Sequence, residues 1–173
     1  MAFRHLLAIL LLPFVVVVVV PRWLLAALRA SDTRWESGLP AVWLPRAAGG
    51  LLALLGFALF AWCVVLFIRV GQGTLAPWDP TRSLVAAGPY RLVRNPMISG
   101  VALMLLGQAL FWGSRAAGAW AAAFFLINHV YFVLLEEPGL ESRFGESYRA
   151  YKASVPRWIP RFSSFLSLRG RKS

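Results

Sequence analysis

Two long uncharged stretches in the second half of the chain limit its possible folds more than any other feature. Residues 97–114 contain no charged side chain, and after Arg115 the next twenty residues, 116–135, are also uncharged. Each stretch approaches the roughly 20 residues that a helix needs to cross the hydrocarbon core of a bilayer. Because Gly113 and Ser114 leave room only for a tight connection, we expect an antiparallel hairpin of two transmembrane helices.

Two further apolar blocks lie in the first half of the chain. Residues 6–21 carry no charge and include six consecutive valines, and the apolar character resumes after Arg22 and continues to Leu28. We expect this block to be a transmembrane helix rather than a cleaved signal peptide, because no small-residue cleavage site follows it. Residues 47–70 form a second block. The sequence therefore predicts an all-α integral membrane protein with about four transmembrane helices.

Composition and charge agree with a membrane protein. The apolar fraction is 59%, the mean hydropathy is +0.65 and only 14% of the residues are charged, which excludes an ordinary soluble domain. The net charge of +11 comes from basic residues that flank the apolar blocks, so we expect membrane lipids and not nucleic acid as partners. We expect no metal site, because Cys63 is alone and His5 and His129 are far apart in sequence.

The distribution of basic residues also predicts an orientation. With four transmembrane helices, both termini and residues 69–97 lie on one side, which carries thirteen Lys and Arg residues against five on the other. The positive-inside rule places that side in the cytoplasm, and we expect a bacterial inner membrane.

A short polar segment, residues 88–100, separates the two halves of the chain. It contains two glycines, two prolines, two arginines, an asparagine and a tyrosine. Glycine and proline prevent a long uninterrupted helix over residues 71–97. Arginines at a membrane boundary are costly to submerge, so we expect Arg91 and Arg94 to face a polar crevice or the lipid headgroups.

The polarity changes again after Leu135, where Glu136-Glu137-Pro138-Gly139 is expected to end the last transmembrane helix. Apolar residues then recur at helical spacing and predict one amphipathic helix on or against the membrane surface. These residues are Leu140, Phe144, Tyr148, Tyr151 and Val155. Three regions follow: a membrane-spanning pair at 1–70, the hairpin and amphipathic helix at 71–161, and a basic, disordered tail at 162–173.

The 88–100 segment and Glu136-Glu137 lie at the same end of the predicted hairpin, so their arginines and glutamates should be close in space. This pattern is compatible with a salt-bridge network at the membrane boundary or with a binding site. Gly100, Gly107 and Gly118 should let the two helices of this hairpin approach each other closely.

Two motifs resemble a known family. Gly-Pro-Tyr-Arg-x-Val-Arg-Asn-Pro-Met-x-x-Gly at residues 88–100, with a glutamate pair at 136–137, Phe-Gly and two tyrosines at 144–151 and Val-Pro-Arg at 155–157, is similar to the isoprenylcysteine carboxyl methyltransferases. The related phospholipid methyltransferases share the pattern. The likeness covers roughly residues 70–161. It implies a membrane methyltransferase that uses S-adenosylmethionine, bound at the cytoplasmic side, to methylate a lipophilic small molecule.

The resemblance also implies the site residues. Tyr90, Arg94, Asn95, Pro96 and Gly100 fall in the first cofactor-binding motif, while Glu136 and Glu137 fall in the second and Arg157 in the tail element. We therefore expect Glu136, Glu137 and Arg157 as catalytic residues. The family commonly has histidine at the position of Asn95 and often tyrosine at that of Ile98. Asparagine keeps hydrogen bonding to a cofactor but cannot transfer a proton.

The residue types fit this chemistry. A carboxylate pairs with the ammonium of S-adenosylmethionine, and an arginine or backbone N–H groups pair with its carboxylate. An amine or thiol acceptor must lose a proton, for which Glu136 or Glu137 is the nearest base, whereas a carboxylate acceptor needs none. Two alternatives remain: an NADPH-dependent reductase of sterol-reductase-like architecture, and a non-catalytic membrane protein. The acceptor, the oligomeric state and which glutamate contacts the cofactor stay open.

Overall fold

The structure is a computed structural model that describes residues 13–28, 32, 35, 42–71 and 84–160. All regular elements in these ranges are helical, which confirms the all-α class. The expected start of the first transmembrane helix, most of the 29–41 loop, residues 72–83 and the expected disordered tail lie outside the described residues.

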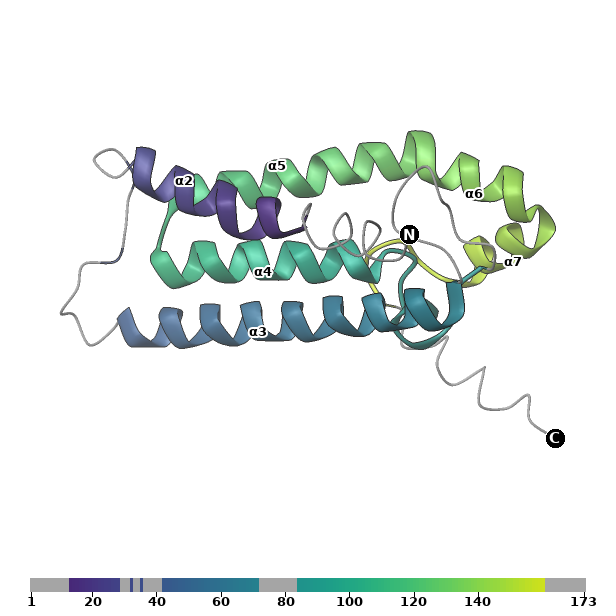
Figure 1. The fold of residues 1–173 in the computed structure, drawn as a ribbon, viewed down its shortest axis with the longest axis horizontal. Helices are drawn as coiled ribbons and strands as arrows, with labels where there is room; N and C mark the ends of the chain where they lie inside the picture. Colours follow the sequence, from purple (N-terminus) through teal and green to yellow (C-terminus); the bar gives the residue numbers. More distant parts are fainter. Residues whose placement is uncertain (1–12, 29–31, 33–34, 36–41, 72–83, 161–173) are drawn as a thin grey trace.

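Four helical segments run side by side in the body of the molecule (Figure 1). The first consists of a π-helical turn, η1 (Val15–Val19), and α2 (Val20–Ala27). The second is α3 (Trp43–Leu66), which continues into the π-helical turn η3 (Phe67–Gly71). A short 3-10 helix, η4 (Gly88–Arg91), precedes the third, α4 (Pro96–Trp112), and the fourth is α5 (Arg115–Tyr131). The last part comprises the π-helical turn η5 (Phe132–Glu136), α6 (Glu137–Phe144) and α7 (Glu146–Ser154).

Two of these segments are long and apolar enough to cross a membrane. They are Trp43–Val70, with 28 residues and a mean hydropathy of 2.8, and Arg115–Phe144, with 30 residues and a mean hydropathy of 1.7. The apolar helices Val15–Ala27 and Pro96–Trp112 are shorter. Most of the outer surface of α3 is apolar and exposed, as a lipid-facing helix requires. The membrane character is thus supported, and the four-helix topology stays a prediction.

Glycines allow α3 and α4 to pack at very short distance in antiparallel order. A Cβ atom added to Gly56 would lie 2.6 Å from the carbonyl oxygen of Gly100, and one added to Gly107 would lie 2.6 Å from that of Gly49. In a membrane, helices gain from such close van der Waals contact because no hydrophobic effect drives them together. Gly100 and Gly107 do allow close packing, but the expectation that they join the two helices of the hairpin was wrong, because they contact α3. A Cβ atom added to Gly118 would lie 3.9 Å from Ala109, an ordinary contact.

The turn between α4 and α5 is fixed by glycine and by capping. Gly113 has φ of +67°, which favours glycine. Ser114 caps α5 by accepting a hydrogen bond of 3.0 Å from the Ala117 N–H, and Asp32 accepts one of 3.1 Å from the Ala116 N–H. This turn places the end of α5 beside the beginning of α4, so that the two polar clusters lie at the same end of the molecule (Figure 1).

Two expectations about the polar end were wrong. Glu136-Glu137-Pro138-Gly139 does not end the helix, which continues from α5 through η5 to Phe144. The wider π-helical turn before Pro138 accommodates the missing proline N–H. The expected single amphipathic helix is in fact two, because Gly145 adopts φ of +53° and ψ of −127° between α6 and α7. This turn directs α7 back towards the 88–95 segment.

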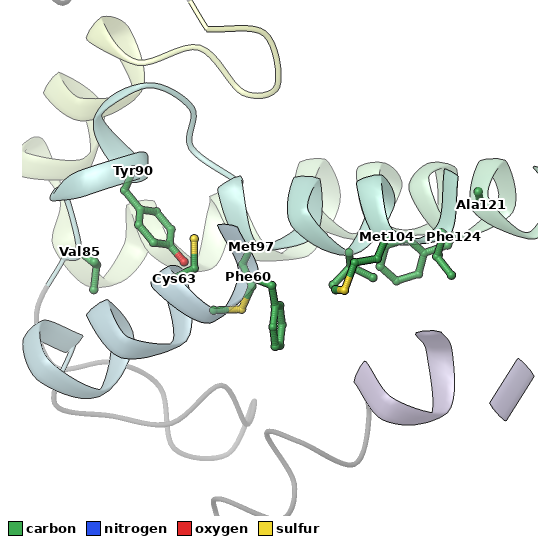
Figure 2. Close-up of a cluster of buried hydrophobic side chains, with 10 residues drawn as sticks. Phe60, Cys63, Val85, Tyr90, Met97, Met104, Ala121 and Phe124 are labelled. Atoms are coloured by element: carbon green, nitrogen blue, oxygen red, sulfur yellow. The ribbon is translucent and has the colours of Figure 1, made fainter. Parts of the chain in front are cut away.

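The buried core joins α3, α4 and α5 to the 88–95 segment. Phe60 and Cys63 of α3 contact Met97 and other buried residues of α4, and Tyr90 belongs to the same cluster. Figure 2 shows the Tyr90 ring pointing from the loop towards Cys63. The packing of the apolar helices therefore extends directly to the loop and fixes its position.

We predict that Gly107→Ala lowers the free energy of unfolding by about 1–3 kcal/mol, because the new methyl group meets backbone atoms that cannot move aside. The matched control is Gly50→Ala on α3, where the nearest atom lies 4.0 Å away and alanine improves helix propensity. Thermal unfolding in detergent measures both variants. Equal effects would contradict the close contact of α3 with α4.

Candidate active site

The two sequence motifs meet at one end of the helices through a buried carboxylate. Glu137 is 2% exposed and accepts a hydrogen bond of 2.8 Å from Arg94 Nη1. It also accepts bonds of 2.7 Å from Arg157 Nε and 3.1 Å from Arg157 Nη2. Lys152 Nζ lies 3.5 Å from its second oxygen. This confirms the expected proximity of the arginines and glutamates and provides a salt-bridge network centred on Glu137.

The segment after α7 folds back over the loop. The Arg94 N–H donates to the carbonyl oxygen of Pro156 at 2.9 Å, and Trp158 Nε1 donates to His129 Nδ1 of α5 at 2.9 Å. Phe125 packs against the Trp158 ring with 4.8 Å between centroids. Residues 155–160, which we call the C-terminal strap, are thus held at both ends. The hydrogen bonds that Arg157 donates to Glu137 raise the pKa of the Arg157 guanidinium, which keeps this cation charged.

Glu136 has a different environment from Glu137. It is half-buried and no Lys, Arg or His nitrogen of the described residues lies within 4.0 Å of its carboxylate. Arg143 is near enough to act on it electrostatically. Its side chain lines a cavity, whereas Glu137 is enclosed by its cationic partners. The two adjacent glutamates therefore differ in environment: Glu137 is enclosed by ion pairs, and Glu136 faces the cavity.

The cavity lies between η3, the 84–98 segment, η5, α6 and α7. Its volume is about 170 Å³ and its wall is mostly apolar. The lining residues are Phe67, Leu84, Val85, Tyr90, Arg94, Asn95, Met97, Ile98, Phe132, Glu136, Leu140, Tyr148 and Tyr151. An apolar cavity with a few convergent polar groups is the usual form of a small-molecule site.

Three polar atoms of the cavity residues have no hydrogen-bond partner among the described residues. They are Arg94 Nε, Asn95 Nδ2 and Tyr148 Oη. Asn95 precedes α4 as its N-cap residue but its side chain makes no capping hydrogen bond, although asparagine usually caps in this position. Leaving a buried donor unpaired costs about 1–3 kcal/mol, so a ligand that pairs with these atoms gains affinity.

Two tyrosines of α7 contribute to the wall in different ways. Burial, and after it the charge of Glu137, raises the pKa of the Tyr148 phenol, while Arg94 acts in the opposite direction. Burial and the neighbouring Tyr148 raise the pKa of Tyr151, whose hydroxyl donates to the Tyr90 carbonyl oxygen at 2.7 Å. Both phenols stay protonated at neutral pH. Only Tyr151 has a protein acceptor for its proton.

The structure places half of the expected site residues at the cavity. Tyr90, Arg94, Asn95 and Glu136 line it. The others lie behind the wall: Pro96 begins α4, Gly100 contacts α3, and Glu137 and Arg157 pair with each other. Sequence reasoning missed Tyr148 and Tyr151 as wall residues. Both tyrosines belong to the apolar periodicity after Leu135, but that pattern predicts only a helix on the membrane surface and not a cavity wall.

Among the described residues, no group of three or more His, Cys, Asp or Glu side chains is placed to hold a metal ion. The described residues give the cavity one carboxylate, several hydrogen-bond donors and an apolar wall.

Comparison with known proteins identifies the family. The family model "Phospholipid methyltransferase" matches residues 45–147, more than half of the chain. An "Uncharacterized protein" of Haemophilus influenzae is 36% identical over 63 residues, which are 36% of this chain and 100% of that protein. "Methanethiol S-methyltransferase 2" of Bradyrhizobium diazoefficiens is 32% identical over 87 residues, 49% of this chain, and the match spans 31% of that protein. No solved structure matches the chain. The matched region contains most of α3, all of α4 and α5, the 88–100 segment and Glu136-Glu137, and the chain belongs to the phospholipid methyltransferase family.

Proposed function

We propose that this protein is a membrane methyltransferase that uses S-adenosylmethionine to methylate a small lipophilic acceptor. The observation that carries the proposal is that the family match includes the 88–100 segment and Glu136, which both contribute to the cavity. S-adenosylmethionine supplies a methyl group that its positive sulfur already activates. The task of the protein is therefore to bind, orient and exclude water.

The cavity residues fit this cofactor. S-adenosylmethionine carries an ammonium, which requires an anionic partner, and Glu136 offers a carboxylate that has no ion pair with any of the described residues. It also carries a carboxylate and ring nitrogens, which accept hydrogen bonds, and Arg94 and Asn95 offer unpaired donors. Tyr90 completes this part of the wall. In our proposal these four residues bind the cofactor.

The remaining expected site residues act by holding the others in place. Glu137 fixes the Arg94 guanidinium, and Arg157 ties the C-terminal strap to Glu137. Pro96 and Gly100 set the start of α4 and its contact with α3. An amine or thiol acceptor must also lose a proton, but in our proposal Glu136, the only glutamate on the cavity wall formed by the described residues, pairs with the cofactor ammonium and does not act as that base.

The location in the cell belongs to the same proposal. We infer four transmembrane helices in a bacterial inner membrane, with the cavity open to the cytoplasm. Two helices of sufficient length and the excess of basic residues on the side of the cavity support this orientation. The name of the Bradyrhizobium relative, a methanethiol S-methyltransferase, supports testing thiols together with amines and carboxylates as acceptors.

We predict that the purified protein in detergent binds S-adenosylmethionine and S-adenosylhomocysteine and does not bind NADPH. Isothermal titration calorimetry measures all three ligands. Transfer of a radioactive methyl group to small thiols, amines and lipid acids then identifies the acceptor class. Binding of NADPH but not of S-adenosylmethionine would contradict this proposal and favour the reductase alternative. Binding of none of the three ligands would favour a non-catalytic protein.

We predict opposite effects for the two neighbouring glutamates. Glu137→Gln leaves three cations around a neutral amide and should lower the free energy of unfolding by about 3 kcal/mol. Glu136→Gln breaks no ion pair and should leave stability nearly unchanged, but it should weaken cofactor binding roughly 10- to 100-fold, as the loss of a charged hydrogen bond does.

Thermal unfolding without ligand and calorimetric titration with S-adenosylmethionine separate these two effects. Loss of binding in Glu137→Gln at a temperature where it is fully folded, together with normal binding in Glu136→Gln, would reverse the roles of the two glutamates.

A further inference from the structure

The C-terminal strap, residues 155–160, extends beyond the polar end of the molecule to side chains of α5 and η5. The Trp158 ring lies 4.8 Å from the ring of Phe125, 6.0 Å from that of His129 and 6.3 Å from that of Phe132, measured between centroids. Residues at these spacings share one face of a helix. In Figure 1 the strap, drawn in yellow, runs from α7 back towards the middle of the helices.

The positions of these contacts along the helix give the depth of the Trp158 ring. Residues 116–135 carry no charge and belong to the segment Arg115–Phe144, which is long and apolar enough to cross a membrane. His129 precedes Leu135 by six positions, which is about 9 Å along the helix axis at 1.5 Å per residue. A bilayer that covers the uncharged stretch therefore also reaches the Trp158 ring.

The indole N–H of Trp158 has a hydrogen-bond partner that suits this depth. An indole nitrogen can only donate, and within the hydrocarbon no water is present to accept the bond. Trp158 Nε1 donates to His129 Nδ1 at 2.9 Å, so the protein itself supplies the acceptor. The pair therefore satisfies both polar atoms without water.

The residues after Trp158 present apolar side chains that the described residues do not cover. Ile159 is 78% exposed, and Pro160 is exposed as well. At the same level of the helix, Leu126 is 60% exposed and Ile127 is 63% exposed. Lipid chains that cover α5 at this level are thus available to the strap.

The first half of the strap stays at the level of the charged groups. Arg157 pairs with Glu137, and the carbonyl oxygen of Pro156 accepts a hydrogen bond from the Arg94 N–H. The chain passes from ion pairs to exposed apolar side chains within a few residues. Such a change of polarity matches the boundary between lipid headgroups and hydrocarbon.

We infer that the C-terminal strap is inserted into the bilayer, with Trp158 and Ile159 among the lipid chains, and that the hydrogen bond to His129 anchors it there. The partner of this surface is the hydrocarbon of the membrane, beside the face of α5 that Trp158 contacts. The inference rests on the membrane character of α5 and is independent of the proposed enzymatic activity. Because Arg157 belongs to the same segment, lipid contact also helps to hold the polar end together.

Spin labels on introduced cysteines measure the depth of the strap in bilayers of phosphatidylethanolamine and phosphatidylglycerol. Ile159→Cys places the label on the strap. Ile127→Cys, at an exposed position of α5, is the lipid reference, and Ser147→Cys, at an exposed position of α7, is the aqueous reference. The native Cys63 is 0% exposed, and wild-type protein treated with the label gives the background. Oxygen concentrates in hydrocarbon whereas a nickel chelate stays in water, so the ratio of their collision rates with each label reports its depth.

We expect the oxygen-to-nickel ratio of Ile159→Cys to lie close to that of Ile127→Cys and well above that of Ser147→Cys. A ratio closer to that of Ser147→Cys would place the strap in water and overturn the inference. An immobile label at position 159 that neither reagent reaches would also overturn it, because protein and not lipid would then cover the strap.

A second comparison, with the label again at position 159, tests the anchoring hydrogen bond. His129→Leu leaves the indole N–H unpaired, so the oxygen-to-nickel ratio should fall towards the aqueous reference. Trp158→Phe keeps an aromatic ring without an N–H, and His129→Leu added to this variant should change the ratio no further. An unchanged ratio in His129→Leu alone, or an equal fall in both backgrounds, would overturn the role of the hydrogen bond.

Discussion

The ionised carboxylate of Glu137 is the constraint on which the polar end of this molecule depends. A charge with 2% exposure loses most of its hydration, which costs several kcal/mol unless neighbouring groups replace the water. Here Arg94 from the loop before α4, Lys152 from α7 and Arg157 from the C-terminal strap replace it. One side chain thereby fixes three segments that are far apart in the sequence. The cavity between them has a defined shape for this reason.

The apolar half of the molecule supplies the rigid support for that arrangement. Glycines of α3 and α4 bring the two backbones together, and the capped turn at Ser114 returns α5 to the level where α4 begins. Because Tyr90 and Met97 belong to the same buried cluster as Phe60 and Cys63, the loop cannot shift without disturbing the helices. The apolar packing of the helices therefore determines where the hydrogen-bond donors of the cavity lie.

The sequence was sufficient to predict the helical class, the membrane character and the meeting of Arg94 with Glu137. Those results depend on long-range patterns: apolar stretches of known length and a short connection that must bring their polar ends together. The course of the helices after α5 was not predicted, because it depends on local backbone geometry that the pattern of apolar residues does not determine. The π-helical turn Phe132–Glu136 carries the helix past Pro138, and the positive φ of Gly145 divides a continuous apolar periodicity into two helices. Without that division, Tyr148 reads as a membrane-facing residue rather than as part of a cavity wall.

The close seam between α3 and α4 also determines how a lipophilic molecule can reach the cavity. Where a single added methyl group would collide with the opposite backbone, no hydrocarbon chain can pass between the two helices. A molecule that diffuses within the bilayer must therefore approach from another side. Phe67 of η3 and Phe132 of η5, which both line the cavity, lie away from the glycine contacts between α3 and α4.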